Sequence, residues 1–340
     1  MITIEENISL RHLNTFGIAV KARYYVDVSS EGQLQEVIRH PVYLAQARLI
    51  LGGGSNILFT KDFEGLVIKS SLVGRAIKKE TTDTVLLEVG AGENWHELVM
   101  YCIQHDWGGV ENLSLIPGTV GAAPMQNIGA YGMEIKDVIE NVTGFNLQSG
   151  VRRTFTNSDC RFNYRESIFK QEAKGKYFIS SITLRLTKKM HHLRMQYGAI
   201  QEVLKRRAVE HPTIKDVSDA IISIRRSKLP DPKVIGNAGS FFKNPTVREE
   251  VFAEIKNTHP LIPSYPADSQ NVKIPAAWLI EQCGWKGKRN GNVGVHPQQA
   301  LVLVNYGIGK GEEIVQLAIE IQASVKEKFG LTLATEVNII

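Results

Sequence analysis

The sequence is poor in cysteine and in long apolar runs. Its 340 residues include three cysteines, Cys102, Cys160 and Cys283, with no CxxC pair and no histidine at metal-ligand spacing, which argues against a zinc site and a disulfide scaffold. No run approaches the ~18 apolar residues of a membrane span. The N-terminus has neither an apolar signal core nor an A-x-A-type cleavage site. We therefore expect a protein of a reducing compartment, the cytoplasm, that does not enter a membrane.

An excess of charge of one sign is also lacking. The chain has 40 Lys and Arg against 35 Asp and Glu, a net charge of +5, which is too dilute for a nucleic-acid-binding surface but compatible with a local site for an anion. Hydrophobic residues make up 43% of the chain, so its whole length is expected to fold, into more than one domain.

Two glycine-rich segments carry the first sign of chemistry. The first glycine segment comprises Gly52, Gly53, Gly54, Ser55 and Asn56, between apolar runs at 48–51 and 66–68 that predict strands. Its unhindered backbone N–H groups suit a phosphate. Its spacing is not that of G-x-G-x-x-G, and no Walker lysine follows, which disfavours a Rossmann domain and a P-loop. A tight turn between strands is the competing interpretation.

The second glycine segment, residues 116–132, reads IPGTVGAAPMQNIGAYG and fits neither strand nor helix periodicity, so we expect a loop with a short helix. Its candidate ligand-contacting residues are Pro117, Gly118, Thr119, Gly121, Ala122 and Gly129. Two such segments about 60 residues apart suit a long ligand with a pyrophosphate, such as a dinucleotide cofactor. The alternative is a tightly packed helix of small residues.

Periodicity predicts several regular elements along the chain. Helices are expected at 94–107, at 217–229, from Pro275 to Cys283, and from 314 to a stop at Gly330. Strands are expected at 138–147, 177–186, 300–304 and 331–340. The charged stretch 188–194 predicts a crossover, with a domain boundary near 210–216.

Four motifs in chain order resemble one enzyme family. They are NTFG at 14–17, ILGGGSN at 50–56, the second glycine segment, and NAGSFFKNP at 237–245. Together they resemble the UDP-N-acetylenolpyruvoylglucosamine reductases, also called UDP-N-acetylmuramate dehydrogenases. The resemblance implies an α+β fold with a two-lobed FAD-binding domain of the vanillyl-alcohol-oxidase type. Lobe 1 would span 1–70, lobe 2 71–212 and an α+β substrate-binding domain 213–330, with strand 331–340 returning near the active site.

The resemblance also implies a reaction. NADPH would reduce non-covalently bound FAD, and flavin N5 would pass a hydride to UDP-N-acetylglucosamine enolpyruvate, giving UDP-N-acetylmuramate for peptidoglycan synthesis. Ser240 matches the family's proton donor, Arg165 the arginine that pairs with the enolpyruvyl carboxylate, and Glu336 the carboxyl group that stabilises the enol. The matched substrate-binding residues are Tyr197, Lys228, Asn244 and Gln299. No metal, nucleic acid, membrane or obligate protein partner is expected.

Other interpretations remain open at this point. Taken singly, Ser240 would be a turn residue, Arg165 a surface ion-pair member and Glu336 a solvated terminal group. The first two glycine motifs alone would also allow an oxidase of the same fold that acts on another alcohol or sugar, and a non-catalytic flavin or nucleotide-sugar binding protein is a third possibility. Asn338 departs from the Glu-Val-Arg ending common in the family, so a cationic contact there is missing or supplied from elsewhere.

Overall fold

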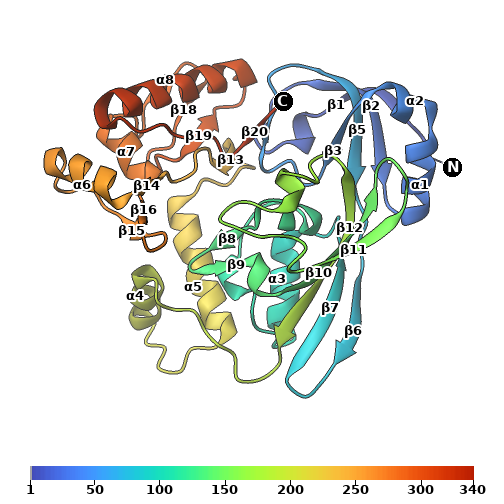
Figure 1. Cartoon of the computed structure of the whole chain (residues 1–340), viewed down its shortest axis with the longest axis horizontal. Helices are drawn as coiled ribbons and strands as arrows, with labels where there is room; N and C mark the ends of the chain where they lie inside the picture. The colour runs from blue at the N-terminus through green and yellow to red at the C-terminus, as the bar shows by residue number, and fades with distance from the viewer. Residues whose placement is uncertain (1) are drawn as a thin grey trace. The chain divides into compact units, whose positions relative to one another are not determined.

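The computed structural model describes residues 2–340, which form two compact units (Figure 1). Unit 1 comprises the residues up to Ile8, together with Ala22–Gly53 and Glu64–Ser227. Unit 2 comprises Ser9–Lys21, Gly54–Phe63 and Lys228–Ile340. Both units contain helices and strands, which confirms the α+β class. The division into domains at residues 70, 212 and 330 stays a prediction.

Unit 1 begins with a four-stranded sheet of order β1-β2-β5-β3, in which β1, β2 and β5 each have one end residue in unit 2. Its strands are β1 (Glu5–Ser9), β2 (Lys21–Val28), β5 (Phe63–Ser70) and β3 (Ala47–Leu51). The helices α1 (Glu31–Arg39) and α2 (Pro41–Ala45) connect β2 to β3. Leu34 and Val37 of α1 are fully buried in one apolar cluster with strand residues. The strands predicted around 48–51 and 66–68 are confirmed as β3 and β5, which pair in parallel.

A five-stranded antiparallel sheet of order β11-β10-β12-β7-β6 follows (Figure 1). Its strands are β11 (Arg152–Thr156), β10 (Ile139–Asn146), β12 (Tyr177–Thr187), β7 (Thr84–Gly90) and β6 (Arg75–Glu80). The two strands predicted at 138–147 and 177–186 are confirmed as the adjacent β10 and β12. The edge strand β11 went unpredicted because it buries only Phe155 and shows no alternation.

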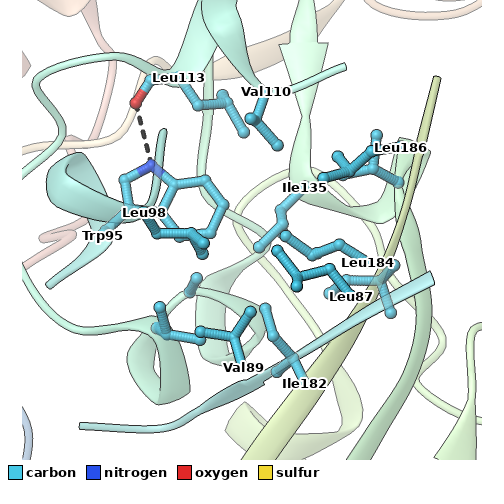
Figure 2. Packing of buried hydrophobic residues seen from close by; sticks show 14 of the residues in the cluster. Leu87, Val89, Trp95, Leu98, Val110, Leu113, Ile135, Ile182, Leu184 and Leu186 are labelled. Atoms are coloured by element: carbon cyan, nitrogen blue, oxygen red, sulfur yellow. Dashed lines mark hydrogen bonds between the residues drawn. The ribbon is translucent and has the colours of Figure 1, made fainter. Parts of the chain in front are cut away.

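A large apolar core lies between this sheet and α3 (Trp95–Gln104). Asn94 caps the helix, since its side-chain oxygen accepts a hydrogen bond from the Glu97 N–H at 3.0 Å. Figure 2 shows the Trp95 ring among the apolar side chains, with its Nε1 donating to the Leu113 carbonyl at 3.0 Å. Each such side chain contributes about 1.5–3 kcal/mol by burial. The sequence predicted this helix and its cap.

Short elements connect α3 to the later strands. The 3₁₀ turns are η2 (Glu111–Leu113), η3 (Val120–Ala122), η4 (Pro124–Gln126), η5 (Ile135–Asp137) and η6 (Ile168–Lys170), and the two-residue strands are β8 (Gly129–Ala130) and β9 (Met133–Glu134). The second glycine segment is thus a loop with two 3₁₀ turns, η3 and η4, in place of the short helix expected. Unit 1 ends with α4 (Gly198–Arg206) and α5 (Ile214–Lys228), which share an apolar cluster.

Unit 2 is built on a four-stranded sheet of order β13-β19-β18-β17. These strands are β13 (Gly236–Ser240), β19 (Val302–Asn305), β18 (Val293–Val295) and β17 (Arg289–Asn290). A smaller sheet comprises β14 (Thr246–Arg248), β16 (Asn271–Lys273) and β15 (Tyr265–Pro266). The remaining elements are η1 (Arg11–Leu13), β4 (Ile57–Leu58), α6 (Glu249–Thr258), α7 (Ala276–Gln282) and α8 (Gly311–Phe329). The predicted helices after Pro275 and before Gly330 are confirmed as α7 and α8; Gly330 ends α8 with φ +69°.

The prediction of a single strand over the last ten residues is wrong. Within this segment only β20 (Asn338–Ile339) is a strand, and it pairs in parallel with β4. The segment changes partner along its length, because the Ala334 carbonyl and Glu336 N–H bond the backbone after Ser240 and the Asn338 N–H bonds Asn56. An extended chain that changes partner every two or three residues does not form a continuous ladder. No helix within residues 2–340 is long and apolar enough to cross a membrane.

Candidate functional site

The two glycine segments lie against each other in unit 1. A Cβ atom added to Gly53 would lie 2.8 Å from the Cα of Gly118, and one added to Gly52 would lie 2.5 Å from Oγ1 of Thr119. Real Cβ atoms do not approach neighbours this closely, so Gly53 is required for backbone-to-backbone packing and Gly52 leaves room for the Thr119 side chain. The contact joins the two segments that the sequence assigned independently to one extended ligand.

Main-chain hydrogen bonds fix the start of the second glycine segment. The Gly118 carbonyl accepts from the Trp95 N–H at 3.1 Å, and the Gly121 N–H donates to the Ala91 carbonyl at 2.8 Å. A Cβ on Gly121 would lie 2.5 Å from the Cβ of Ala91. The small residues therefore allow the segment to pack closely on the turn that precedes α3.

Arg165 lies at the tip of a two-residue hairpin. Asn163 and Glu166 exchange both of their backbone hydrogen bonds at 3.0 Å, which leaves Tyr164 and Arg165 in the turn, and Arg165 adopts a left-handed φ of +53°. Its Nη2 donates to the Gly129 carbonyl at 2.7 Å and its Nη1 to the Asn127 carbonyl at 3.4 Å. Two carbonyls of the second glycine segment thus hold the guanidinium of this candidate catalytic residue.

Further positive charge gathers beside this arginine. Nε of Arg225, on α5, is buried and has no hydrogen-bond partner within residues 2–340. Burial lowers the pKa of Arg225, and Arg165 lowers it further, while Tyr131 opposes the shift. A buried guanidinium next to a second one is typical of a site for an anion. This orphaned donor, together with the two glycine segments, fits a cofactor that carries a pyrophosphate.

His96 belongs to the same electropositive region. Its Nδ1 accepts a hydrogen bond from the Leu115 N–H at 3.0 Å, so the ring proton of neutral His96 is on Nε2. Burial lowers the pKa of His96, and the positive charges of Arg226 and Arg225 lower it further. His96 is therefore held neutral at physiological pH.

Tyr197, which the sequence predicted as a substrate residue, lies next to the second glycine segment. It is half exposed, just before α4, and its ring meets the ring of Tyr131 edge-on with centroids 5.7 Å apart. A Cβ on Gly132 would lie 3.4 Å from Cε2 of Tyr197. An exposed aromatic ring at this position can cover a ligand placed on the segment.

In unit 2, Thr15 connects three of the motifs. Its N–H and Oγ1 donate to the Gly54 carbonyl at 3.0 and 3.3 Å, and its own carbonyl accepts from the Asn237 N–H at 3.0 Å. Gly54 has a φ of +63°, and a Cβ there would overlap the Leu13 carbonyl. The NTFG motif therefore holds the end of the first glycine segment and the start of NAGSFFKNP.

Ser240, the candidate proton donor, follows a bulge in β13. Asn237 pairs with Val304 whereas Ser240 pairs with Val302, so β13 has one extra residue between them, and Gly239 there has a φ of +70°. The Asn237 side chain stabilises the bulge, because its Oδ1 accepts from the Gly239 N–H at 3.0 Å. Bulges re-aim the side chains that follow, and here the side chain is the half-buried Ser240.

Glu336 is attached to the same part of unit 2 by its backbone. Its N–H donates to the carbonyl of Phe241, the residue after Ser240, at 2.8 Å, and its carbonyl accepts from Nδ2 of Asn56 at 3.3 Å. The structure therefore brings the backbones of Ser240, Glu336 and the first glycine segment together.

The other predicted substrate residues of unit 2 lie in separate places. Oδ1 of Asn244 accepts from the Ala276 N–H at 2.9 Å, at the start of α7, and Oε1 of Gln299 accepts from the Leu301 N–H at 3.3 Å. Lys228 is exposed and is the last residue of α5. Arg165 and Tyr197 belong to unit 1 and Ser240, Asn244, Gln299 and Glu336 to unit 2.

Sequence reasoning missed several residues of this region. Arg225 lies in the RRSKLP stretch, where Lys228 alone was singled out, and Asn127 was not among the candidate residues of the second glycine segment. Thr15 and Asn237 were visible inside their motifs, but their hydrogen bonds join distant segments. Metal ligation is not indicated, since residues 2–340 contain no cluster of three His, Cys, Asp or Glu side chains suited to a metal ion.

Comparison with known proteins defines the class of the chain. Residues 22–151, which contain both glycine segments, match the family model of the FAD binding domain. The two glycine segments and the buried Arg225 fit that cofactor. The chain is an FAD-dependent oxidoreductase.

Residues 231–340 match the model of the UDP-N-acetylenolpyruvoylglucosamine reductase C-terminal domain. The chain is 48% identical over 337 residues to UDP-N-acetylenolpyruvoylglucosamine reductase of Flavobacterium johnsoniae, covering 99% of both chains. The identity is 49% to the enzyme of that name from Chromobacterium violaceum, with 97% of each covered, and 50% to that from Amoebophilus asiaticus, with 99% of each covered. The chain therefore belongs to the UDP-N-acetylenolpyruvoylglucosamine reductase family.

A solved structure supports the fold. The crystal structure of UDP-N-acetylenolpyruvylglucosamine reductase from Thermus caldophilus matches with a TM-score of 0.69 and 21% identity, covering 100% of this chain and 99% of that one.

Proposed function

We propose that the chain catalyses the NADPH-dependent reduction of UDP-N-acetylglucosamine enolpyruvate to UDP-N-acetylmuramate, a precursor of peptidoglycan. The observation that carries the proposal is the near full-length identity to relatives with that enzyme name. The junction of Thr15, Gly54 and Asn237 supports it further, because three motifs far apart in the sequence meet there.

The chemistry determines what the protein must supply. When bound, FAD would supply the redox chemistry, which is hydride transfer from NADPH to the enolpyruvyl double bond. Addition at one carbon places negative charge on the carbon α to the carboxylate, so the site needs a cation at the carboxylate and an acid at that carbon.

Arg165 is suited to the first of these tasks. A guanidinium binds a carboxylate through two parallel hydrogen bonds, and this one is already oriented by the carbonyls of Gly129 and Asn127. We assign it to the enolpyruvyl carboxylate. Glu336, on the segment bonded to Phe241, is assigned to hydrogen bonding with the enol.

Ser240 is assigned to donate the proton to the α carbon. A hydroxyl is a weak acid, so it needs a fixed position and a polar environment that stabilises its conjugate base. The bulge stabilised by Asn237 provides the fixed position.

The remaining residues bind the nucleotide part of the substrate. Lys228 is assigned to the diphosphate, for which a compact cation at a mobile side-chain end is suited. Asn244 and Gln299 are assigned to the nucleotide, because each keeps side-chain hydrogen-bonding groups besides the one that bonds the backbone. Tyr197 is assigned to cover the substrate with its half-exposed ring.

An anaerobic two-step experiment tests the proposal. The purified holoprotein is first reduced with one equivalent of NADPH and then mixed with UDP-N-acetylglucosamine enolpyruvate, while flavin absorbance is followed. We expect bleaching in the first step and return of the oxidised spectrum, with formation of UDP-N-acetylmuramate, in the second. UDP-N-acetylglucosamine, which lacks the enolpyruvyl group, serves as the control and should leave the flavin reduced. Failure of the enolpyruvyl compound to reoxidise the flavin would overturn the proposal.

A further inference from the structure

Asn127 lies between the second glycine segment and the hairpin of Arg165. It is fully buried and left-handed, with a φ of +45°, immediately after η4. Asparagine tolerates this backbone conformation better than most residues, but glycine would adopt it with no steric cost, so the backbone alone does not require asparagine here. The side chain must therefore be explained by its contacts.

Those contacts use both donors of the amide and its oxygen. Nδ2 donates to Oε2 of Glu134 at 2.9 Å and to the Asn163 carbonyl at 3.0 Å, while Oδ1 accepts from the Lys136 N–H at 3.1 Å. The Glu134 carboxylate is also paired with Nζ of Lys136 at 2.7 Å. The donors fix the orientation of the amide, since a carboxylate and a carbonyl can only accept.

The bond to Asn163 acts on the base of the hairpin. Asn163 and Glu166 close the hairpin through two backbone hydrogen bonds, and Arg165 lies within the turn in a left-handed conformation. A left-handed arginine is held by its surroundings rather than by its own preference. Anchoring the Asn163 carbonyl therefore determines where the turn presents Arg165.

The main chain of Asn127 acts on the other end of the same residue. Its carbonyl accepts from Nη1 of Arg165 at 3.4 Å, two residues before the Gly129 carbonyl that accepts from Nη2 at 2.7 Å. A Cβ on Gly129 would lie 2.9 Å from the Met133 carbonyl oxygen and 3.0 Å from that Nη1, so a larger residue here would crowd the guanidinium. Asn127 thus contacts the Arg165 loop at its base through the side chain and at its head through the backbone.

We propose that Asn127 is a positioning residue that sets the orientation of Arg165 for the substrate carboxylate. The inference rests on the proposed function, in which Arg165 binds that group. The orientation of Arg165 matters because ordering a mobile arginine upon substrate binding would cost part of the binding free energy. A misplaced guanidinium would also lower the rate of the chemical step.

A double-mutant cycle in the two half-reactions tests the proposal. Asn127→Gly keeps the left-handed backbone and removes the amide, and Arg165→Ala removes the group to be positioned. We expect Asn127→Gly to slow reoxidation of reduced flavin by the enolpyruvyl substrate about 10-fold, while flavin reduction by NADPH stays within about 2-fold of wild type. In the Arg165→Ala background, Asn127→Gly should cause no further slowing, because there is nothing left to position.

Asn157→Ala is the matched control. Nδ2 of Asn157 also donates to two carbonyls of this region, those of Lys136 and Ile139, at 2.7 and 2.8 Å, but it does not contact the Arg165 hairpin. The Asn157→Ala variant should have a lower melting temperature than the wild type and the same rate of flavin reoxidation. If Asn127→Gly does not fold, the double variant Asn127→Asp with Glu134→Gln keeps one carboxylate and one amide in the pair but still loses the bond to the Asn163 carbonyl, and we expect the same slowing.

The outcomes separate the two proposals. Failure of the wild-type protein to be reoxidised by the enolpyruvyl substrate would overturn the proposed function. Normal reoxidation in Arg165→Ala would leave that function standing and overturn the assignment of Arg165 to the carboxylate, and with it the positioning role of Asn127. Slow reoxidation in Arg165→Ala, combined with a normal rate in Asn127→Gly or with fully additive effects in the double variant, would overturn the positioning role of Asn127 alone.

Discussion

The side-chain amide of Asn338 donates a hydrogen bond to the main-chain carbonyl of Asn56, with 3.0 Å between the two atoms. The backbone N–H of Asn338 donates to the same oxygen at 3.1 Å, and Nδ2 of Asn56 donates to the Glu336 carbonyl at 3.3 Å. The two asparagines therefore fasten the C-terminal segment to the first glycine segment. Asn338 stands where the family's usual Glu-Val-Arg ending has arginine, and its side chain here stabilises the attachment of the C-terminal segment.

Asn338→Ala should lower the free energy of unfolding by about 0.5–1.5 kcal/mol, because it removes the side-chain bond and leaves the backbone bond in place. Urea unfolding of the holoprotein measures the change. Thr332→Ala is the control, since Thr332 is exposed on the same segment and its side chain has no hydrogen bond within residues 2–340. Equal unfolding midpoints for the two variants would show that the asparagine pair contributes nothing.

Gly53→Ala should weaken FAD binding and lower the free energy of unfolding by about 1–3 kcal/mol. The new methyl group would meet the Cα of Gly118 at 2.8 Å, and backbone on both sides cannot move aside cheaply. Fluorescence titration of the apoprotein with FAD and thermal melting provide the measurements. In Gly32→Ala, within α1, the methyl group meets a single side-chain atom at 3.9 Å, so unchanged FAD affinity and equal or higher stability are expected there.

Ser240→Ala should slow reoxidation of the flavin by the enolpyruvyl substrate about 10²–10⁴-fold and leave reduction by NADPH nearly unchanged. Only the second half-reaction needs a proton on carbon, so stopped-flow absorbance of each half-reaction separates the two. Ser240→Cys, which keeps an acidic hydrogen at the same place, should retain part of the rate. Equal slowing of both half-reactions would remove Ser240 from the role of proton donor.

His96 should make the protein less stable as the pH falls below neutrality. Its folded-state pKa is lowered from the ordinary 6.5 by burial and by Arg226 and Arg225, so the unfolded chain takes up a proton first. The stability that neutral His96 provides is complete above pH 6.5 and is lost as the pH falls from there through the folded-state pKa. Urea unfolding at a series of pH values should show this decline in the wild type.

His96→Asn should reduce that decline while keeping an acceptor for the Leu115 N–H. Burial also lowers the pKa of His296, so part of the pH dependence will remain in the variant. His192→Gln, at an exposed position, is the control and should follow the wild type. An identical decline in His96→Asn and wild type would refute the assignment.

The local parts of the fold could be predicted because they leave periodic signals. The cap at Asn94, the buried face of α3 and the left-handed Gly330 after α8 each depend on residues within a few positions of one another. Strand β1 could not be predicted in the same way, because its residues are mostly exposed and show no alternation.

The sequence motifs singled out the candidate site residues, but they did not predict the hydrogen bonds and contacts that join the motifs. The sequence singled out both glycine segments, and packing of Gly53 on Gly118 joins them. Nothing in the spacing indicated that Thr15 would bond both Gly54 and Asn237, since such backbone bonds do not constrain residue type. The error in the last ten residues has the same cause: an extended sequence does not say how often its partner changes.

The order of the chain has a consequence for how the protein is made. Unit 2 takes Ser9–Lys21 and Gly54–Phe63 from the N-terminal part of the chain, and the Phe16 carbonyl accepts from Nδ2 of Asn305, 289 residues later. On the ribosome these two early segments lack their partners from the C-terminal part of unit 2 until almost the whole chain has been translated, while the sheets of unit 1 can already close. A message truncated before codon 305 would therefore give a chain with its N-terminal segments unburied, which suits it for removal by proteolysis.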